Sequence, residues 1–203
     1  MASEKPNEVR RMGFRPDQLR VRLNLAARLL AHNARPRLVE RATALPWQVV
    51  TGLSAGIHGT HATRGPFRAS CENLLLTRSV QVLASAFAVR FLAHAGPRPR
   101  QVSADHWLAA YEEWLAVTSP TLHSRLSVND AWRIAEDLRI GAWCDRSAPG
   151  AAWMEHCPDC ERRFLVAGES MRLRGCPHCA LLRFQRRPAM DAEPLGDVRA
   201  AAL

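Results

Sequence analysis

The chain has 203 residues, of which 47% are hydrophobic, so its length and composition fit one substantial core with a small appended module and exclude a disordered protein. Its formal net charge is +9. The first eleven residues are polar, and Arg78 and Arg90 interrupt the most apolar stretch, so we expect neither a signal peptide nor a membrane span. A soluble, cytoplasmic protein with reduced cysteines is expected.

The positive charge is concentrated at the two ends of the sequence. Residues 1–70 carry a net +8 and residues 162–203 a net +4, whereas residues 71–161 carry a net −3. This distribution is typical of a protein that contacts nucleic acid at its ends and packs through its middle. An arginine-rich coding bias is the alternative explanation, because 27 of the 28 basic residues are arginine.

The N-terminal part of the chain predicts an arm followed by three helices. Residues 1–15 are expected to form the flexible arm. Apolar side chains then recur at three- and four-residue intervals over residues 16–33, which predicts an amphipathic helix. Two shorter helices are expected at residues 37–42 and 46–54, with a short break between them.

The two short helices have spacings near those of a helix-turn-helix over residues 37–54, whose second helix would enter the DNA major groove. Glu40 stands where a small residue normally lets the two helices approach. In this interpretation Gln48 is placed to read an adenine edge, and the outward-facing residues are Trp47, Gln48, Thr51 and Ser54. The alternative is two short helices that belong only to the core.

Residues 55–69 contain glycine, threonine and histidine without periodicity, which predicts a loop. A long helix is expected to follow, beginning at Ser70 or Asn73 and ending at residue 94. Cys71 would then lie on this helix as a small buried residue.

The remaining helices complete a helical domain over residues 16–143. They are predicted at residues 103–117 and 127–143, and Trp132 belongs to the buried face of the second. The fold class expected from these elements is mostly α, a helical body followed by a small cysteine module.

One polar cluster near the loop is the only reason to consider an enzyme. Its members are His58, His61, Cys71 and Glu72. The surrounding sequence has no phosphate-binding glycine pattern and no pair of acids, so loop histidines are the simpler explanation and no enzymatic activity is expected.

Two Cys-x-x-Cys motifs separated by fifteen residues give the strongest signal in the sequence. Each tight turn brings two thiolates to one side, and the spacer is long enough for a hairpin that delivers the second pair opposite the first. Four thiolates complete the tetrahedron that Zn²⁺ prefers and leave no open coordination position. We therefore predict one structural zinc ion bound by Cys157, Cys160, Cys176 and Cys179.

The zinc-ribbon-like module is expected to span residues 144–187. Its first part, residues 144–155, is predicted to be a linker, and residues 188–203 are predicted to be a tail. Within the module, residues 164–166 are predicted to pair as a strand with residues 171–173. Alternative metal ligands nearby are His156, His178 and Cys144.

Arginines are frequent along the predicted hairpin, where seven arginines and one glutamate fall between residues 162 and 187. A metal-stabilised hairpin with such side chains can contact DNA phosphates or a groove. The alternatives are a solvated surface and a docking surface for an acidic protein. The predicted DNA contacts are Arg162, Arg163, Arg172, Arg174, Arg183, Arg186 and Arg187, together with Gln48.

Over about residues 19–182 the chain resembles the FlhC family. Its members are the zinc-containing subunits of the FlhD–FlhC transcriptional activator of flagellar genes, together with FlhC-like activators of conjugative elements. The resemblance rests on four features in order: the N-terminal helix with the helix-turn-helix-like stretch, Gly65-Pro66-Phe67 before the long helix, Ala131-Trp132 nine residues before Gly141, and the paired cysteine motifs.

The resemblance implies a mostly α-helical, DNA-binding activator subunit. Such a subunit would assemble with an FlhD-like partner into a hetero-oligomer, bind promoter DNA and recruit RNA polymerase, with the family's zinc cysteines falling on the four cysteines named above. The competing hypothesis is a zinc-stabilised adaptor that binds acidic protein and does not contact DNA.

Overall fold

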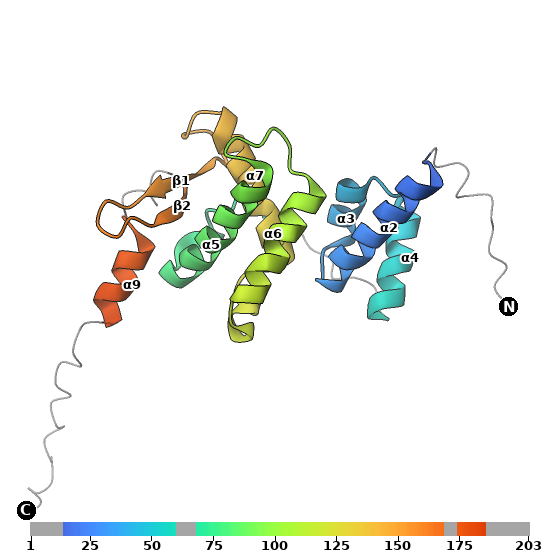
Figure 1. Cartoon of the computed structure of the whole chain (residues 1–203), viewed down its shortest axis with the longest axis horizontal. Coiled ribbons are helices and arrows are strands. Elements are labelled where there is room, and N and C mark those ends of the chain that lie inside the picture. The colour runs from blue at the N-terminus through green and yellow to red at the C-terminus, as the bar shows by residue number, and fades with distance from the viewer. Residues whose placement is uncertain (1–13, 60–67, 169–173, 186–203) are drawn as a thin grey trace, which may run out of the picture.

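The computed structural model describes residues 14–59, 68–168 and 174–185, and within these residues the chain is mostly helical, as predicted (Figure 1). The predicted arm, except for its last two residues, and the predicted tail lie outside them. No helix in the described ranges is long and apolar enough to cross a bilayer. The elements are α2 (Pro16–Ala31), α3 (Pro36–Thr43), α4 (Trp47–His58), α5 (Arg78–Ala95), α6 (Ala104–Val117), α7 (Val128–Trp143), β1 (Ala152–His156), β2 (Arg163–Ala167) and α9 (Pro177–Gln185), with 3-10 turns at Leu74–Leu76 and Pro120–Arg125.

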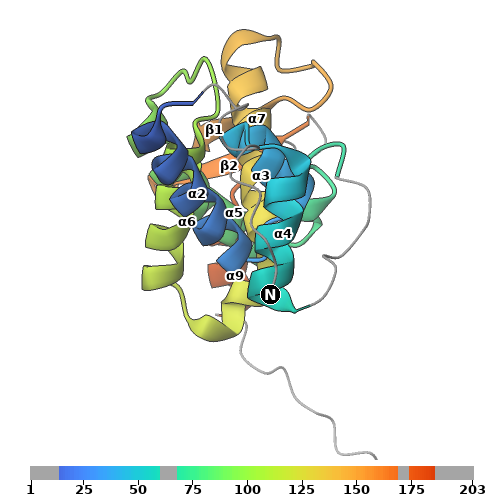
Figure 2. The same ribbon diagram turned by 90° about the vertical axis from the view of Figure 1, so that its right-hand side faces the viewer.

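Helices α2, α3 and α4 pack on one another at one end of the molecule (Figures 1 and 2). A proline at the first position, where its missing N–H costs nothing, begins both α2 and α3. Ala44 has a left-handed φ of 54° and ends α3, which turns the chain sharply into α4. The buried side chains Leu38, Val39 and Val50 hold this three-helix unit together.

Helix α4 differs from its prediction in two respects. It continues to His58, into the residues predicted to begin a loop, and ends where Gly59 takes a positive φ of 67°. Gly56, which belongs to the predicted loop, and Gly52 both face open space, so they weaken the helix without disrupting its packing. Ser54 is only 3% exposed and therefore does not face outward as predicted, because it lies on the side of α4 that packs against the unit.

Helices α5, α6 and α7 form the body, with Phe87, Trp107 and Trp114 fully buried among them. Ser127 caps α7 through a reciprocal pair of hydrogen bonds with Asp130, which confirms the predicted start of this helix. Trp132, predicted to belong to the core, is 8% exposed.

Helix α5 begins at Arg78, later than predicted. The buried carboxylate of Asp137 on α7 accepts the backbone N–H of Cys71 at 2.7 Å, and this bond holds the preceding segment in a turn. Cys71 is fully buried, as expected, although it precedes the helix. The segment before the helix is therefore held by a contact with α7, and Thr77 caps α5 by accepting the Val80 N–H at 3.4 Å, so the helix begins at Arg78.

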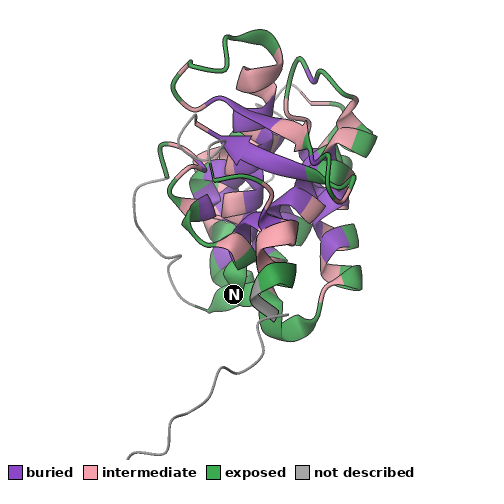
Figure 3. Cartoon of the chain, turned by 90° about the vertical axis from the view of Figure 1, so that its left-hand side faces the viewer, coloured by how far each residue is buried: buried purple, intermediate pink, exposed green. Residues whose placement is uncertain are grey.

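The two strands form an antiparallel hairpin in which Ala152 pairs with Ala167 and His156 with Arg163. The predicted partner of residues 164–166, residues 171–173, lies outside the described structure. Within the described residues β2 pairs with β1, which was predicted to be a linker. The sheet packs against α5 and α7, and its strands are mostly buried (Figure 3). Its residues Leu165 and Val166 belong to the same hydrophobic core as the helices.

Gly141 allows α7 to approach β1, because a Cβ atom added there would lie 2.0 Å from the carbonyl oxygen of Ala152. We expect Gly141→Ala to lower the free energy of unfolding by about 2–3 kcal/mol, since backbone must move to admit the methyl group. Denaturant unfolding of the variant and the wild-type protein measures this change in free energy. Gly52→Ala is the matched control: its methyl group meets nothing within 4 Å, so it should leave stability unchanged or raise it by up to about 1 kcal/mol. Equal stability of the two variants would contradict the close approach.

Candidate metal centre

The four predicted cysteines come together at one site. All four sulfur atoms lie within 4.8 Å of one another, and the Cys157–Cys179 and Cys160–Cys176 sulfur pairs are each 3.7 Å apart. Four sulfurs arranged as a tetrahedron about 2.3 Å from a central ion would be separated by about 3.8 Å. The donor set and its spacing therefore fit a four-thiolate metal site.

The first cysteine pair lies in the turn between the strands. The Cys157 N–H donates to the carbonyl of Arg162 at 3.0 Å, and the Glu161 N–H donates to the carbonyl of Cys157 at 2.9 Å. Glu161 adopts a left-handed φ of 58°, which closes the turn. The sheet register thus fixes where Cys157 and Cys160 lie.

The second cysteine pair lies at the start of α9. Gly175 precedes it with a φ of 71°, a conformation that favours glycine. Pro177 begins the helix, and the Ala180 N–H donates to the carbonyl of Cys176 at 3.2 Å. Cys176 consequently lies immediately before α9 and Cys179 on its first turn, and their sulfurs lie beside those of the first pair.

Electrostatics at the site favour a bound cation. Burial raises the pKa of the Cys157 thiol, but backbone N–H groups of Cys160 and Asp159 outweigh it and lower that pKa to about 7. The pKa of Cys179 is raised to about 12, first by its hydrogen bond with Cys160 and then by burial and the other thiols. Four sulfurs this close cannot all ionise together unless a cation compensates their charge, and a coordinated metal ion supplies that charge.

Arg78, at the start of α5, anchors the second cysteine pair to the body. Its guanidinium donates to the carbonyl of Gly175 at 2.8 Å and also to the carbonyl of Arg174. In return, Arg174 donates to the carbonyl of Leu76 at 3.3 Å. Sequence reasoning treated Arg78 only as a charge in an apolar stretch, and its long-range partners could not be found from local pattern.

Buried polar side chains of α5 anchor the sheet. Gln81 Nε2 donates to the carbonyl of Leu165 at 2.9 Å, and Ser85 Oγ accepts the Leu165 N–H at 2.9 Å. The Ser85 hydroxyl itself donates to the Gln81 carbonyl at 2.6 Å. These two side chains thus form hydrogen bonds with the Leu165 N–H and carbonyl on the outer edge of β2, as a third strand would. The sequence signal for this role was that Gln81 and Ser85 are polar residues within an otherwise apolar stretch.

We expect Ser85→Ala to lower the free energy of unfolding by about 1–3 kcal/mol, because the Leu165 N–H would stay buried without an acceptor. Ser79→Ala, at an exposed position on the same helix, is the matched control and should change stability little. Thermal or urea unfolding of both variants measures the difference. A Ser85→Ala protein as stable as the control would contradict this role.

The predicted DNA contacts fall in two places. Arg162 and Arg163 are exposed beside the first cysteine pair, while Arg174 and Arg183 line a hollow of about 340 Å³ next to the sulfur cluster. Gln48 is exposed on the first turn of α4, and α4 and α9 lie at opposite ends of the long axis (Figure 1). The others, Arg172, Arg186 and Arg187, lie outside the described residues.

Two of the described arginines of the cysteine module have polar neighbours. Arg162 lies 3.4 Å from Nδ1 of His178, whose pKa is lowered first by burial and then by this guanidinium. Arg183 forms an exposed ion pair of 3.8 Å with Asp159. Such exposed pairs contribute little to stability, so Arg183 remains available to an external phosphate.

The alternative ligands and the residues considered for catalysis are placed elsewhere. His156, His178 and Cys144 do not belong to the cysteine cluster found among the described residues. His58 lies 2.9 Å from the carbonyl oxygen of Leu30, and Cys71 is buried beside Asp137. His61 lies outside the described residues.

No protein-family model matches the chain, and the comparison with curated proteins gives no match.

Proposed function

We propose that the chain is a zinc-stabilised, DNA-binding subunit of a transcriptional activator, similar to FlhC. The observation that supports it most is the cluster of four cysteine sulfurs, all within 4.8 Å of one another, on a module with exposed arginines. In this role the chain acts in the cytoplasm with an FlhD-like partner and RNA polymerase, at promoters of flagellar or related genes, and catalyses no reaction.

The metal we propose is one structural Zn²⁺ ion. Four thiolates satisfy its preferred coordination and leave no position for a substrate or water. The ion would tie the turn between β1 and β2 to the first turn of α9. Because the ion would link these two segments directly, part of the energy of metal binding becomes energy of folding.

The DNA contacts we propose come from both ends of the molecule. Residues 14–58 contain seven arginines and two acidic residues, and this segment presents Gln48 on the exposed face of α4. The cysteine module presents Arg162 and Arg163 on its surface. A duplex that follows the long axis would reach both groups, with phosphate contacts supplying most of the affinity.

Footprinting and a salt titration of promoter DNA binding, each with and without a co-expressed FlhD-like protein, test this proposal. We expect a protected site, and an affinity that falls steeply with salt. Replacing Arg162 and Arg163 together by Gln should lower the salt slope by about 1 for each lost phosphate contact. Arg125→Gln, an exposed arginine in the turn before α7, is the control. A salt-independent affinity, or equal slopes for both variants, would contradict the proposal.

A second candidate function is a zinc-stabilised protein adaptor. It is favoured by the composition of α4, where residues 47–58 contain neither lysine nor arginine and Ile57 is 43% exposed. A recognition helix normally carries side chains that contact phosphates or bases. Stable co-purification with a protein, combined with no measurable affinity for DNA, would favour the adaptor.

A further inference from the structure

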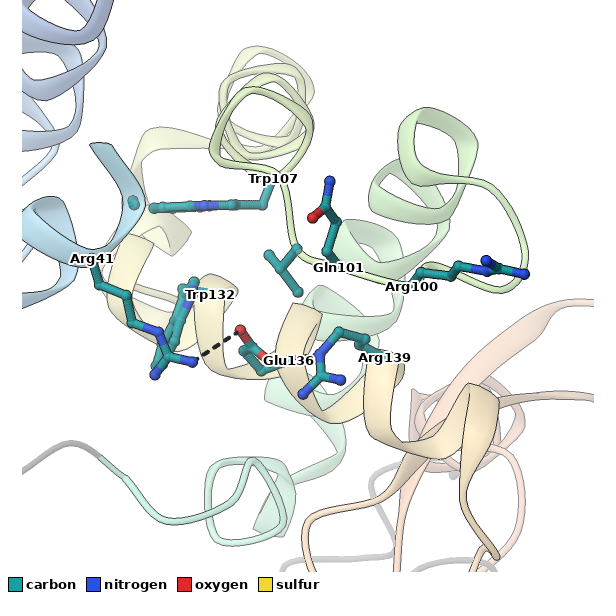
Figure 4. A pocket seen from close by; sticks show the side chains of 9 residues that line it. Arg41, Arg100, Gln101, Trp107, Trp132, Glu136 and Arg139 are labelled. Atoms are coloured by element: carbon teal, nitrogen blue, oxygen red, sulfur yellow. Dashed lines mark hydrogen bonds and ion pairs between the residues drawn. The ribbon is translucent and has the colours of Figure 1, made fainter. Parts of the chain in front are cut away.

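A groove on the body lies where α3, the connection between α5 and α6, and α7 meet (Figure 4). Its deeper part is a cavity of about 290 Å³. A second hollow, of about 210 Å³, shares Arg100 and Arg139 with it and continues to Trp143. In the described structure none of the four clustered cysteines lines either hollow, so the groove is separate from the metal centre.

The groove carries an excess of positive charge. Glu136 lies between Arg41 and Arg139 (Figure 4), 4.0 Å from the first and 2.9 Å from the second. Arg41 comes from α3, and its side chain is 70% exposed. Arg100 has no ion-pair partner in the described part of the chain. One carboxylate cannot neutralise three guanidinium groups, so the groove attracts an anion.

Indole rings lie beside these arginines. The Trp143 ring is fixed by a 3.0 Å hydrogen bond from its N–H to the carbonyl of Pro99, yet the residue is 53% exposed. The Arg100 guanidinium lies 5.7 Å from the Trp143 ring centre, and that of Arg41 lies 5.5 Å from the Trp132 ring centre. A fixed, exposed indole next to cations offers a stacking surface for a base and charge for its phosphate.

We propose that this groove binds a nucleotide, either free or as part of a single strand. Arg41 and Arg139 hold its phosphate, and Trp143 stacks on its base. Small-molecule sites in proteins measure about 300–1,000 Å³, so the deeper cavity of about 290 Å³, just below this range, suits one nucleotide rather than a large cofactor. Because Arg41 belongs to the three-helix unit and Arg139 to the body, the ligand would link these two parts. This site goes beyond the proposed role and does not require promoter binding.

Calorimetric titration of the full-length protein tests the proposal, with AMP, inorganic phosphate, a short oligothymidylate and a polyglutamate peptide as probes. We expect saturable binding of AMP or of the oligonucleotide. Arg41→Gln and Arg139→Gln should each weaken it about tenfold. Trp143→Ala should weaken the ring-containing probes and leave inorganic phosphate unaffected. Arg125→Gln is the control, because Arg125 is exposed and does not line the groove.

The outcomes separate the sources of the nucleotide. Binding of AMP would indicate a free nucleotide, and binding of the oligonucleotide alone would indicate a single strand. Either result supports the site if the arginine variants bind the probe more weakly and their melting curves show intact folding. Binding of none of the probes, of polyglutamate alone, or of nucleotide with equal affinity in all variants would overturn it. Loss of promoter binding in a protein that still binds AMP would count against the proposed function alone.

Discussion

Replacing Cys160 by Ser should abolish stoichiometric zinc binding and unfold the two segments that the ion holds, the turn between β1 and β2 and the start of α9. The Cys160 sulfur lies 3.7 Å from that of Cys176, within a cluster that spans only 4.8 Å, so no other described side chain is placed to replace it. Structural zinc sites bind their ion with about 10–16 kcal/mol at neutral pH, and much of this energy is energy of folding. Metal analysis of the purified protein, combined with hydrogen exchange of β1, β2 and α9, measures both effects.

Cys144→Ser is the matched control for this change. Cys144 is exposed at the end of α7 and lies outside the cluster. Its variant should retain one zinc ion per chain and the hydrogen-exchange protection of the wild-type sheet. A Cys160→Ser protein that keeps a full equivalent of tightly bound zinc would contradict the assignment of the ligands.

Zinc binding should also release protons and weaken as the pH falls. Without a cation the pKa of Cys179 lies at about 12, so this thiol is protonated at neutral pH and must lose its proton when it binds the metal. Cys157, with a pKa of about 7, loses its proton more readily. The stabilisation from zinc is therefore largest at high pH and decreases through pH 7 and below. Calorimetry in buffers of different ionisation enthalpy measures the protons released, and none released would contradict this charge state.

The second large effect is expected from Asp137→Ala, which should lower the free energy of unfolding by about 3–5 kcal/mol. The Asp137 carboxylate is completely buried on α7 and forms an ion pair with Arg133. It also accepts the Cys71 N–H at 2.7 Å and the Ser70 hydroxyl at 3.5 Å. Removing it leaves the partly buried Arg133 guanidinium without its ion-pair partner and the Cys71 N–H without its acceptor.

Denaturant unfolding of two further variants gives the comparison. Glu113→Ala removes an exposed carboxylate that pairs with His94 at 2.9 Å; because exposed pairs contribute about 0–1 kcal/mol, little change is expected. Replacing Arg133 and Asp137 together by Met and Leu should recover much of the lost stability, since no buried charge remains. Unfolding energies for Asp137→Ala and Glu113→Ala that agree within 1 kcal/mol would show that Asp137 does not have this role.

Features encoded by local sequence were predicted well. The two Cys-x-x-Cys motifs correctly predicted that four sulfurs meet at one site, because each tight turn brings its own two sulfurs to one side without a distant contact. The start of α7 was marked by Ser127, whose capping geometry with Asp130 depends only on neighbouring residues. The mostly helical class followed from the periodicity of the apolar residues.

Features set by distant contacts were missed. Strand β1 lies in the predicted linker because its place depends on β2 and on the close approach of Ala152 to Gly141. Likewise, Arg78 and Ser85 lie on α5, but their roles depend on partners about eighty to one hundred residues away. No local pattern in one sequence carries that information.

In the function we propose, DNA binding depends on a zinc ion that holds the arginine-bearing module in place. Promoter affinity measured in one preparation before zinc removal, after chelation and after zinc is returned tests this dependence. We expect at least a tenfold loss of affinity on chelation and recovery when zinc is restored, because Arg162 lies on the turn that the ion holds and Arg163 directly follows it at the start of β2. Unchanged affinity in the zinc-free protein would contradict the claim.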